Sequence, residues 1–279
     1  MEFEHVLYEQ TDDVLKITVN RPDKRNVISR RVYAELDEAF DRAERDDSVK
    51  VIVVAGAGDH FGGGHDLGTD EMRSELDEFP RDTSPGGRIT SMDRGVYWRM
   101  HDRWRNIGKP TIAMIQGYCI MGSWMLAASC DLAVASEDAL FADRSVRWGG
   151  AHHEYPTHFW ELGIKKAKEH LWTGDFIDAD EAYRLGMVNR VVPRESLEEA
   201  TLWLARRVAL NDPVALKLSK MSINQAADIM GQSAAVRASG NFWLIGGSGS
   251  GGSEEPNRVR WSKQQNERFD AQAGEDRPW

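Results

Sequence analysis

The sequence predicts an α/β fold whose sheet is mainly parallel. Short apolar runs of strand length recur along the chain, and segments in which apolar residues repeat at helical spacing separate them. Two of the runs, residues 49–55 and 111–116, are apolar apart from Lys50, Thr111 and Gln116, which is typical of strands buried on both faces of a parallel sheet. The repeated strand–helix order therefore favours an α/β architecture with parallel pairing.

Turn signals and hydrophobic periodicity place the individual elements. A turn at Thr11–Asp13 joins the first two strands, and the helix at 29–45 repeats its apolar residues at helical spacing. In chain order we expect strands within 6–20, a loop at 21–26, a helix at 29–45, a strand at 49–55, a glycine-rich loop at 56–67, a helix around 96–107, a strand at 111–116, a turn at 117–122, a helix at 123–130, a strand at 131–135, a helix from 165, a short helix at 178–185, a strand at 187–192, and helices at 196–210 and 213–230.

The chain is predicted to divide into a core and a helical C-terminal region. Residues 1–195 form the predicted core, in which the polar and irregular segment 70–95 is expected to be a mobile loop or an insertion. Residues 196–279 form the predicted C-terminal region, with one helix around 261–271 near its end. The stretch 246–253 contains only glycine and serine, so it is expected to be a flexible linker.

Bulk composition narrows the class of protein. The 279 residues carry a formal net charge of −10 and no long basic run, which speaks against a nucleic-acid partner because phosphate binding needs clustered Lys and Arg. Two cysteines, Cys119 and Cys130, make no disulfide framework. The sequence shows no signal segment and no apolar run of roughly 20 residues. We therefore expect a cytoplasmic protein without a membrane partner.

Two glycine-containing loops, at 56–67 and 117–122, each follow a buried strand. Glycine lets backbone N–H groups turn outward without a Cβ in the way, and two converging N–H groups form an oxyanion hole. The second loop leads into the helix that starts at Ser123, whose dipole would add to the effect. The alternative is that the glycines serve only tight turns.

Several blocks of the chain resemble the crotonase (enoyl-CoA hydratase/isomerase) family. They occur in the family's order from about residue 5 to about residue 225. The blocks are Arg21-Pro22-Asp23-Lys24-Arg25-Asn26; Val51–Ala55 with Gly56-x-Gly58-x-x-Phe61-x-x-Gly64-x-Asp66-Leu67; Lys109-Pro110-Thr111-Ile112-Ala113 through Gly117-Tyr118, Gly122 and Ala128-x-Cys130-Asp131-Leu132; and Thr173-Gly174-Asp175, Ala182 and Gly186-Met187-Val188-Asn189 to Val191-Val192-Pro193. The resemblance implies a ββα spiral core with a C-terminal helical trimerisation region, assembled as a homotrimer or homohexamer.

The resemblance also implies an acyl-CoA substrate, with coenzyme A as part of the substrate and no separate cofactor. It places the family's two oxyanion N–H donors on the backbone of His65 and Gly122. The imidazole of His65 then forms either part of the wall or part of the chemistry. Lys24 and Arg25 match positions near the coenzyme A phosphates, unless they are simply solvated loop charges. Two further residues of the signature are assigned to coenzyme A binding, Asp66 and Leu67.

The chain departs from the family at the two positions where hydratases carry glutamates. Those positions hold Met125 and Ser145. Hydration of a conjugated double bond needs one group to deprotonate water and another to protonate carbon, and methionine can do neither. Serine cannot act as a base without a partner. The standard two-glutamate mechanism is therefore not available.

Polar residues between 143 and 155 are candidates to replace the glutamates. Relatives with other chemistry place an acidic residue close to His152 and His153, and a carboxylate beside an imidazole in a partly apolar pocket titrates near neutrality. The candidates for acid–base work are Glu154, His152, His153 and Asp143. Asp143 could instead pair with Arg144 or Arg147, and any one of the others could lie at the surface or an interface.

The acyl group is expected to occupy an apolar pocket. Trp124 and Trp148 flank the expected site and, with Met125 and Ser145, make up its predicted wall. The order His153-Glu154-x-x-x-His158 could also suggest a metal site. Its two imidazoles diverge at this spacing and Pro156 breaks the helix, so we expect no metal.

Three functions remain open from the sequence. The first is an enzyme that stabilises an enolate of an acyl-CoA thioester, through hydration, isomerisation or carbon–carbon cleavage. The second is a non-catalytic acyl-CoA-binding protein, which Met125 and Ser145 favour. A purely structural scaffold would leave the charged loop at 21–26 unexplained.

Overall fold

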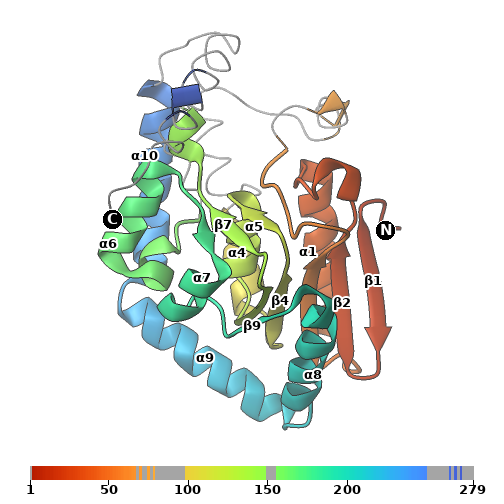
Figure 1. The fold of residues 1–279 in the computed structure, drawn as a ribbon. Coiled ribbons are helices and arrows are strands. Elements are labelled where there is room, and N and C mark those ends of the chain that lie inside the picture. The colour runs from red at the N-terminus through yellow and green to blue at the C-terminus, as the bar shows by residue number, and fades with distance from the viewer. Residues whose placement is uncertain are drawn as a thin grey trace.

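The computed structural model describes residues 2–66, 98–148 and 155–249 continuously, together with positions 69, 70, 74, 75, 78, 264, 267, 268 and 271. The alternation of strands and helices that the sequence predicts is present (Figure 1). The strands are β1 (Val6–Thr11), β2 (Val14–Val19), β3 (Val51–Gly56), β4 (Thr111–Ile115), β5 (Tyr118–Ile120), β6 (Leu132–Ser136), β7 (Leu140–Ala142), β8 (Ile177–Asp178) and β9 (Arg190–Val192). The α-helices are α1 (Arg30–Arg45), α4 (Trp98–Asn106), α5 (Gly122–Ala128), α6 (His158–Thr173), α7 (Ala179–Leu185), α8 (Leu197–Ala209), α9 (Pro213–Ile229) and α10 (Gln232–Gly249).

The main sheet has six strands in the order β1-β2-β3-β4-β6-β9. Only β1 and β2 pair antiparallel, and every later pair is parallel. The parallel α/β architecture predicted from the apolar runs is therefore confirmed. All six residues of β3 are buried, because alternate side chains enter cores on opposite faces of the sheet.

The two faces of the sheet are covered by different helices. On one face, Ile52 and Val54 pack in the same core as Leu36 and Phe40 of α1. On the other face, α8 lies across β3, β4 and β6 and contributes buried Leu197, Ala205 and Ala209. Helix α9 then leads away from α8 towards α10, which it contacts (Figure 1).

A second sheet of three strands, in the order β5-β7-β8, was not predicted. The prediction of a plain turn at 117–122 is wrong, because Tyr118–Ile120 forms β5 and pairs with β7. Local turn signals cannot reveal this pairing, since the partner strand lies about 20 residues further along the chain. The small sheet holds the segment that enters α5.

Two boundaries near the C-terminal half also differ from the prediction. Helix α6 starts at His158 rather than 165 and is interrupted at Gly163, whose φ of 71° is non-helical. Helix α10 extends to Gly249, so the beginning of the stretch 246–253 is helical rather than a flexible linker. The predicted segment 70–95 lies almost entirely outside the described residues. No helix in the described part of the chain is both long and apolar enough to cross a membrane.

Candidate functional site

The two glycine-containing loops lie directly against each other. The N–H of Gly62 donates to the carbonyl of Tyr118 at 2.8 Å, and the N–H of Ile120 donates back to Gly62 at 3.0 Å. Further along, the N–H of Gly64 donates to Oγ of Ser123 at 3.1 Å. The first loop therefore runs beside β5 and reaches the first turn of α5.

This approach requires glycine at two positions of the first loop. A Cβ on Gly62 would lie 2.1 Å from Oγ of Ser123, far inside any contact distance. Gly64 has a φ of 98°, and its Cβ would lie 3.0 Å from the carbonyl oxygen of Ile120. The glycines thus allow the first loop to pack closely against Ser123 and against the backbone of β5, and do more than make a turn.

Helix α5 begins at Gly122 after an unusual backbone conformation. Met121 has a φ of 46° and a ψ of −114°, which non-glycine residues rarely adopt. Its N–H donates to the carbonyl of Ala142 in β7, so the small sheet holds it in place. Residues held in such conformations cluster at functional sites. The N–H of Gly122 follows in the first turn, where a helix supplies no carbonyl partner of its own.

His65 stands opposite the start of α5. The N–H of Ile28 donates to Gly64, and the N–H of Asp66 donates to Ile28, so this segment forms a parallel bridge. Successive N–H groups of extended backbone point to opposite sides, which directs the N–H of His65 away from Ile28. The His65 ring lies against Gly122: a Cβ there would meet ring atoms at 2.5–3.0 Å.

Lys24 and Arg25 lie exposed on a loop that is fixed to the first glycine-containing loop. Asn26 holds the loop, since its side chain accepts from the N–H of Arg21 and donates to the carbonyls of Ala57 and His60. The carbonyl of Arg25 also accepts from the N–H of Gly63 at 2.7 Å. The exposed charged pair is thus attached through Gly63 to the segment that contains His65, two residues further along the chain.

Asp66 is buried and holds the loop from inside. Its Oδ2 pairs with Nη1 of Arg21 at 3.1 Å, and both side chains are almost fully buried. The same carboxylate accepts from the N–H and the hydroxyl of Thr69. Its assignment to coenzyme A binding stays a prediction, as does that of Leu67, which lies outside the described residues.

Met125 and Trp124 point to different sides of α5. Met125 packs with Tyr155 and with Val236 of α10, and forms part of an apolar wall. Trp124 contacts Phe141 and donates its Nε1–H to Glu161 at 2.9 Å. These two residues of the predicted wall and a third, Ser145, are buried. The side chain of Trp148 is not among those that the structure describes.

A buried polar cluster lies on the Trp124 side of α5. Glu161 Oε2 accepts from Trp124 and from the hydroxyl of Thr157 at 3.0 Å. Burial raises the pKa of the Glu161 carboxyl to about 7, and the two hydrogen bonds oppose that rise only in part. Sequence analysis missed Glu161; its position three residues after His158 on one helix was the available signal.

Asp143 and Ser145 belong to the same cluster. Asp143 Oδ1 accepts from the N–H of Ser145 at 3.0 Å and from its hydroxyl at 2.6 Å. Asp143 Oδ2 lies 3.5 Å from Nε2 of His158, whose ring also touches Trp124. The Asp143 carboxylate therefore lies between Ser145 and His158. An activated serine nucleophile needs the histidine between the serine and the carboxylate, and that order is not formed. Three other predicted acid–base candidates, His152, His153 and Glu154, lie outside the described residues.

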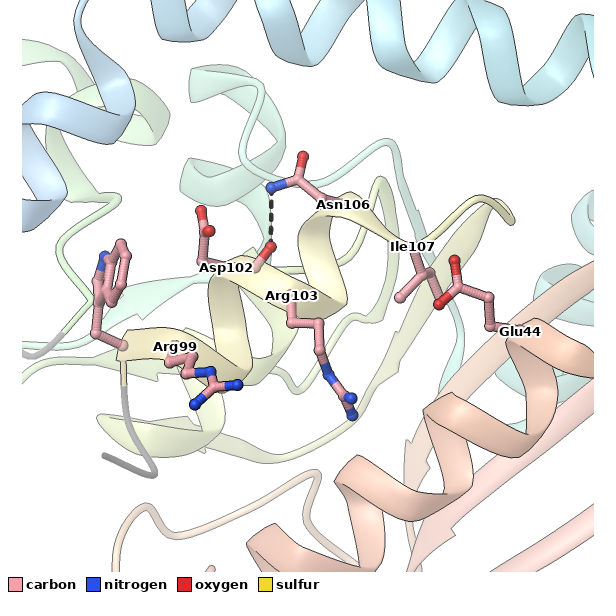
Figure 2. Close-up of a pocket in the computed structure, with 7 residues that line it drawn as sticks. Glu44, Arg99, Asp102, Arg103, Asn106 and Ile107 are labelled. Atoms are coloured by element: carbon pink, nitrogen blue, oxygen red, sulfur yellow. Dashed lines mark hydrogen bonds between the residues drawn. The ribbon is translucent and has the colours of Figure 1, made fainter. Parts of the chain in front are cut away.

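A separate surface pocket of about 490 Å³ lies beside α4 (Figure 2). Glu44 at the end of α1 and residues of α4 line it, with Arg103 and Asp102 giving it mixed charge. Arg103 also pairs with Asp37 of α1. The lining includes none of the predicted site residues, so we do not place the acyl group there.

Comparison with known proteins agrees with the fold. The model of the enoyl-CoA hydratase/isomerase family matches residues 9–242. The chain belongs to this family. It is 44% identical over 248 residues to a Mycobacterium tuberculosis protein named "Putative enoyl-CoA hydratase EchA13". The aligned region covers 84% of this chain and 78% of that relative.

Solved structures of the family superimpose on most of the chain. One from Mycobacterium smegmatis, described as a "probable" enoyl-CoA hydratase, is 40% identical with a TM-score of 0.81 and covers 88% of this chain and 96% of its own. An enoyl-CoA hydratase/isomerase from Xanthobacter autotrophicus is 28% identical with a TM-score of 0.82 and covers 97% and 99%. The predicted crotonase-type fold is thereby confirmed.

Proposed function

We propose that the protein is an enzyme that acts on an acyl-CoA thioester by stabilising its enolate. The observation that supports this proposal most is the packing of the His65 segment against the start of α5, which brings the His65 ring onto Gly122. The thioester oxygen accepts hydrogen bonds from the N–H groups of His65 and Gly122. These donors are fixed before the reaction, so they stabilise charge on the oxygen without reorganising.

The reaction differs from standard hydration because of the residues at the glutamate positions. Met125 is buried in an apolar wall, and the hydroxyl of Ser145 is committed to Asp143. Neither residue can deprotonate water. The proton is moved instead by another group. The sequence offers His152, His153, Glu154 and Asp143 as candidates and also leaves the imidazole of His65 open. The chemistry is therefore hydration by other residues, isomerisation or another enolate reaction.

A turnover assay tests the proposal. The protein is incubated with short, long, branched and ring-containing trans-2-enoyl-CoA esters, and products are identified by mass spectrometry against a control without enzyme. We expect at least one ester to be converted to a hydrated or isomerised product. Recovery of every ester unchanged, with no binding, would contradict the proposal.

The alternative is a protein that binds acyl-CoA without converting it. Met125 and Ser145 favour it, since they remove both standard acid–base groups. In the same assay this alternative predicts that esters bind and are recovered unchanged. The strained backbone at Met121 counts against it, because such strain is retained where it positions a functional group.

The exposed pair Lys24 and Arg25 is proposed to bind the phosphates of coenzyme A. Changing either to alanine is expected to weaken binding of an acyl-CoA ester by about fivefold, because an exposed ion pair contributes about 1 kcal/mol or less. The pantetheine ester of the same acyl group lacks the phosphates of coenzyme A. It should bind both variants with the same affinity as it binds the wild type. Titration calorimetry measures both ligands. Lys165→Ala, at another exposed lysine, is the matched control.

Equal weakening for both esters would contradict this role, since it would show a general effect on the loop. Raising the salt concentration should reduce the wild-type preference for the coenzyme A ester.

We also propose that the protein assembles as a homotrimer or homohexamer. Large apolar side chains are exposed to solvent along α9 and just beyond it. Exposed apolar patches of this kind are typical of interfaces between proteins. They are Val214, Leu218, Met221, Ile223, Ile229 and Met230. Burial of this surface between copies would stabilise the assembly through the hydrophobic effect.

A further inference from the structure

We propose that the imidazole of His65 moves the proton in the reaction, in addition to the role of its backbone N–H. This inference rests on the proposed function and names the acid–base group that the missing glutamates leave open. It assigns to one residue both a hydrogen bond to the thioester oxygen and the transfer of a proton at the neighbouring carbon.

The position of the ring carries the inference. Three atoms of the imidazole, Cε1, Nδ1 and Nε2, lie 2.5, 2.6 and 3.0 Å from the point where a Cβ of Gly122 would be. The ring therefore touches the residue whose N–H is proposed to hold the thioester oxygen. An acyl α-carbon is one bond from the carbonyl carbon, so a base that serves it has to stand next to the oxyanion hole.

The ring is also held in one orientation. Oη of Tyr33, on α1, lies 3.4 Å from Nδ1 of His65. Tyr33 is itself fixed by His101, which meets it edge-on, and by Trp104, which stacks on it. In the tautomer in which Nδ1–H donates to the oxygen of Tyr33, Nε2 carries the lone pair of the neutral imidazole, and the proposal uses this tautomer.

The other buried titratable cluster reaches α5 from a different side. Trp124 follows Gly122 by two residues, which is a rotation of about 200° around a helix. Glu161 and His158 contact Trp124, so they lie away from the side of Gly122. Met125 shares a face with Gly122 but cannot accept a proton. The three atoms nearest to a Cβ placed on Gly122 all belong to the His65 ring, which therefore lies beside Gly122.

The proposed step conserves atoms and electrons. The bond between the acyl α-carbon and its hydrogen breaks, and the proton forms an N–H bond at Nε2 of His65. The electron pair of the broken bond forms the carbon–carbon double bond of the enolate, while the carbonyl pair moves to the oxygen held by the two N–H groups. Return of the proton to the same carbon or to a carbon further along regenerates the neutral imidazole.

Within the described residues, Tyr33, His101 and Asp66 are the titratable groups that can be placed near the ring. Tyr33 faces it from α1, with His101 of α4 behind Tyr33. Asp66 follows His65 in the chain, and its carboxylate is paired with Arg21. A limb of the pH–rate profile that disappears on removal of the imidazole would therefore be assigned to His65.

The test measures deuterium uptake at the α-carbon of acyl-CoA esters in D₂O by mass spectrometry, across a range of pH, together with ester binding by calorimetry. His65→Gln is expected to slow uptake by about 100-fold or more while leaving the dissociation constant within about threefold, because a general base contributes about 10²- to 10⁴-fold. Tyr33→Phe is expected to slow uptake less, by about tenfold, and to shift the pH limb, because it removes only the orienting hydroxyl. His170→Gln, at a buried histidine of α6, is the matched control and should behave as wild type.

The outcomes separate this inference from the function on which it rests. If His65→Gln takes up deuterium at the wild-type rate and with the same pH limb, the imidazole does not move the proton. The proposed function would then still stand. Wild-type protein that neither binds nor exchanges any ester overturns the proposed function first. If His65→Gln does not fold, Tyr33→Phe decides, since an unshifted limb in that variant also overturns the inference.

Discussion

Gly122→Ala is expected to reduce turnover of an acyl-CoA ester by about 100-fold to 1,000-fold, the loss typical of removing one oxyanion donor. The new Cβ would lie 2.5–3.0 Å from ring atoms of His65, where no real Cβ is found. The ring has little room to withdraw because His65 is only 9% exposed and Tyr33 stands behind it. The start of α5 has to shift instead, and the N–H of Gly122 moves with it. Steady-state kinetics with the best ester from the panel measures the effect.

Two further variants make the result specific. Gly108→Ala is the matched control, since its Cβ would meet only the flexible end of the Lys217 side chain. The double variant Gly122→Ala with His65→Ala should recover thermal stability lost in the single variant, because the clash is gone. A Gly122→Ala enzyme with wild-type turnover would show that this N–H does not hold the thioester oxygen.

Glu161→Gln is expected to remove a pH dependence of stability that the wild type shows. The folded pKa of Glu161 is about 7, above its ordinary value of 4.5, because the carboxyl is buried. Below pH 4.5 the group is protonated in both the folded and the unfolded state, and burial carries no ionic cost. Between pH 4.5 and pH 7 the unfolded chain has ionised at Glu161 while the folded chain still holds the proton, so over this range the folded state loses about 3 kcal/mol relative to a neutral side chain.

Glutamine stays neutral at every pH and still accepts hydrogen bonds from Trp124 and Thr157. The variant should therefore unfold at higher denaturant concentration than the wild type at pH 8 and at a similar concentration near pH 4.5. Glu169→Gln on the same helix is the control, because Glu169 is exposed and pairs with Lys166. Parallel stability curves for wild type and Glu161→Gln across this range would contradict the assignment.

The main sheet could be predicted because its central strands are recognisable from their own residues. Continuous apolar runs such as Val51–Ala55 and Ile112–Ile115 are typical of buried strands, and the structure buries every residue of both. The small sheet escaped prediction because β5, β7 and β8 are each at most three residues long. Strands so short depend on partners far along the chain rather than on their own residues.

The close approach of the two loops at the candidate site could also be predicted from the sequence, because glycines occur where the two loops meet. The positions of the side chains around it could not. The position of the His65 ring depends on Tyr33, which is 32 residues away, and the burial of Glu161 depends on Trp124, which is 37 residues away. Such contacts are set by the tertiary fold, and no local pattern in the chain records them.

The most direct test of the account is a crystal structure of the protein with a bound acyl-CoA ester that it does not consume. The account predicts that the thioester oxygen lies about 3 Å from the N–H nitrogens of both His65 and Gly122, with the coenzyme A phosphates near Lys24 and Arg25. An ester bound elsewhere, for example in the pocket beside α4 (Figure 2), or with its thioester oxygen turned away from both N–H groups, would contradict it.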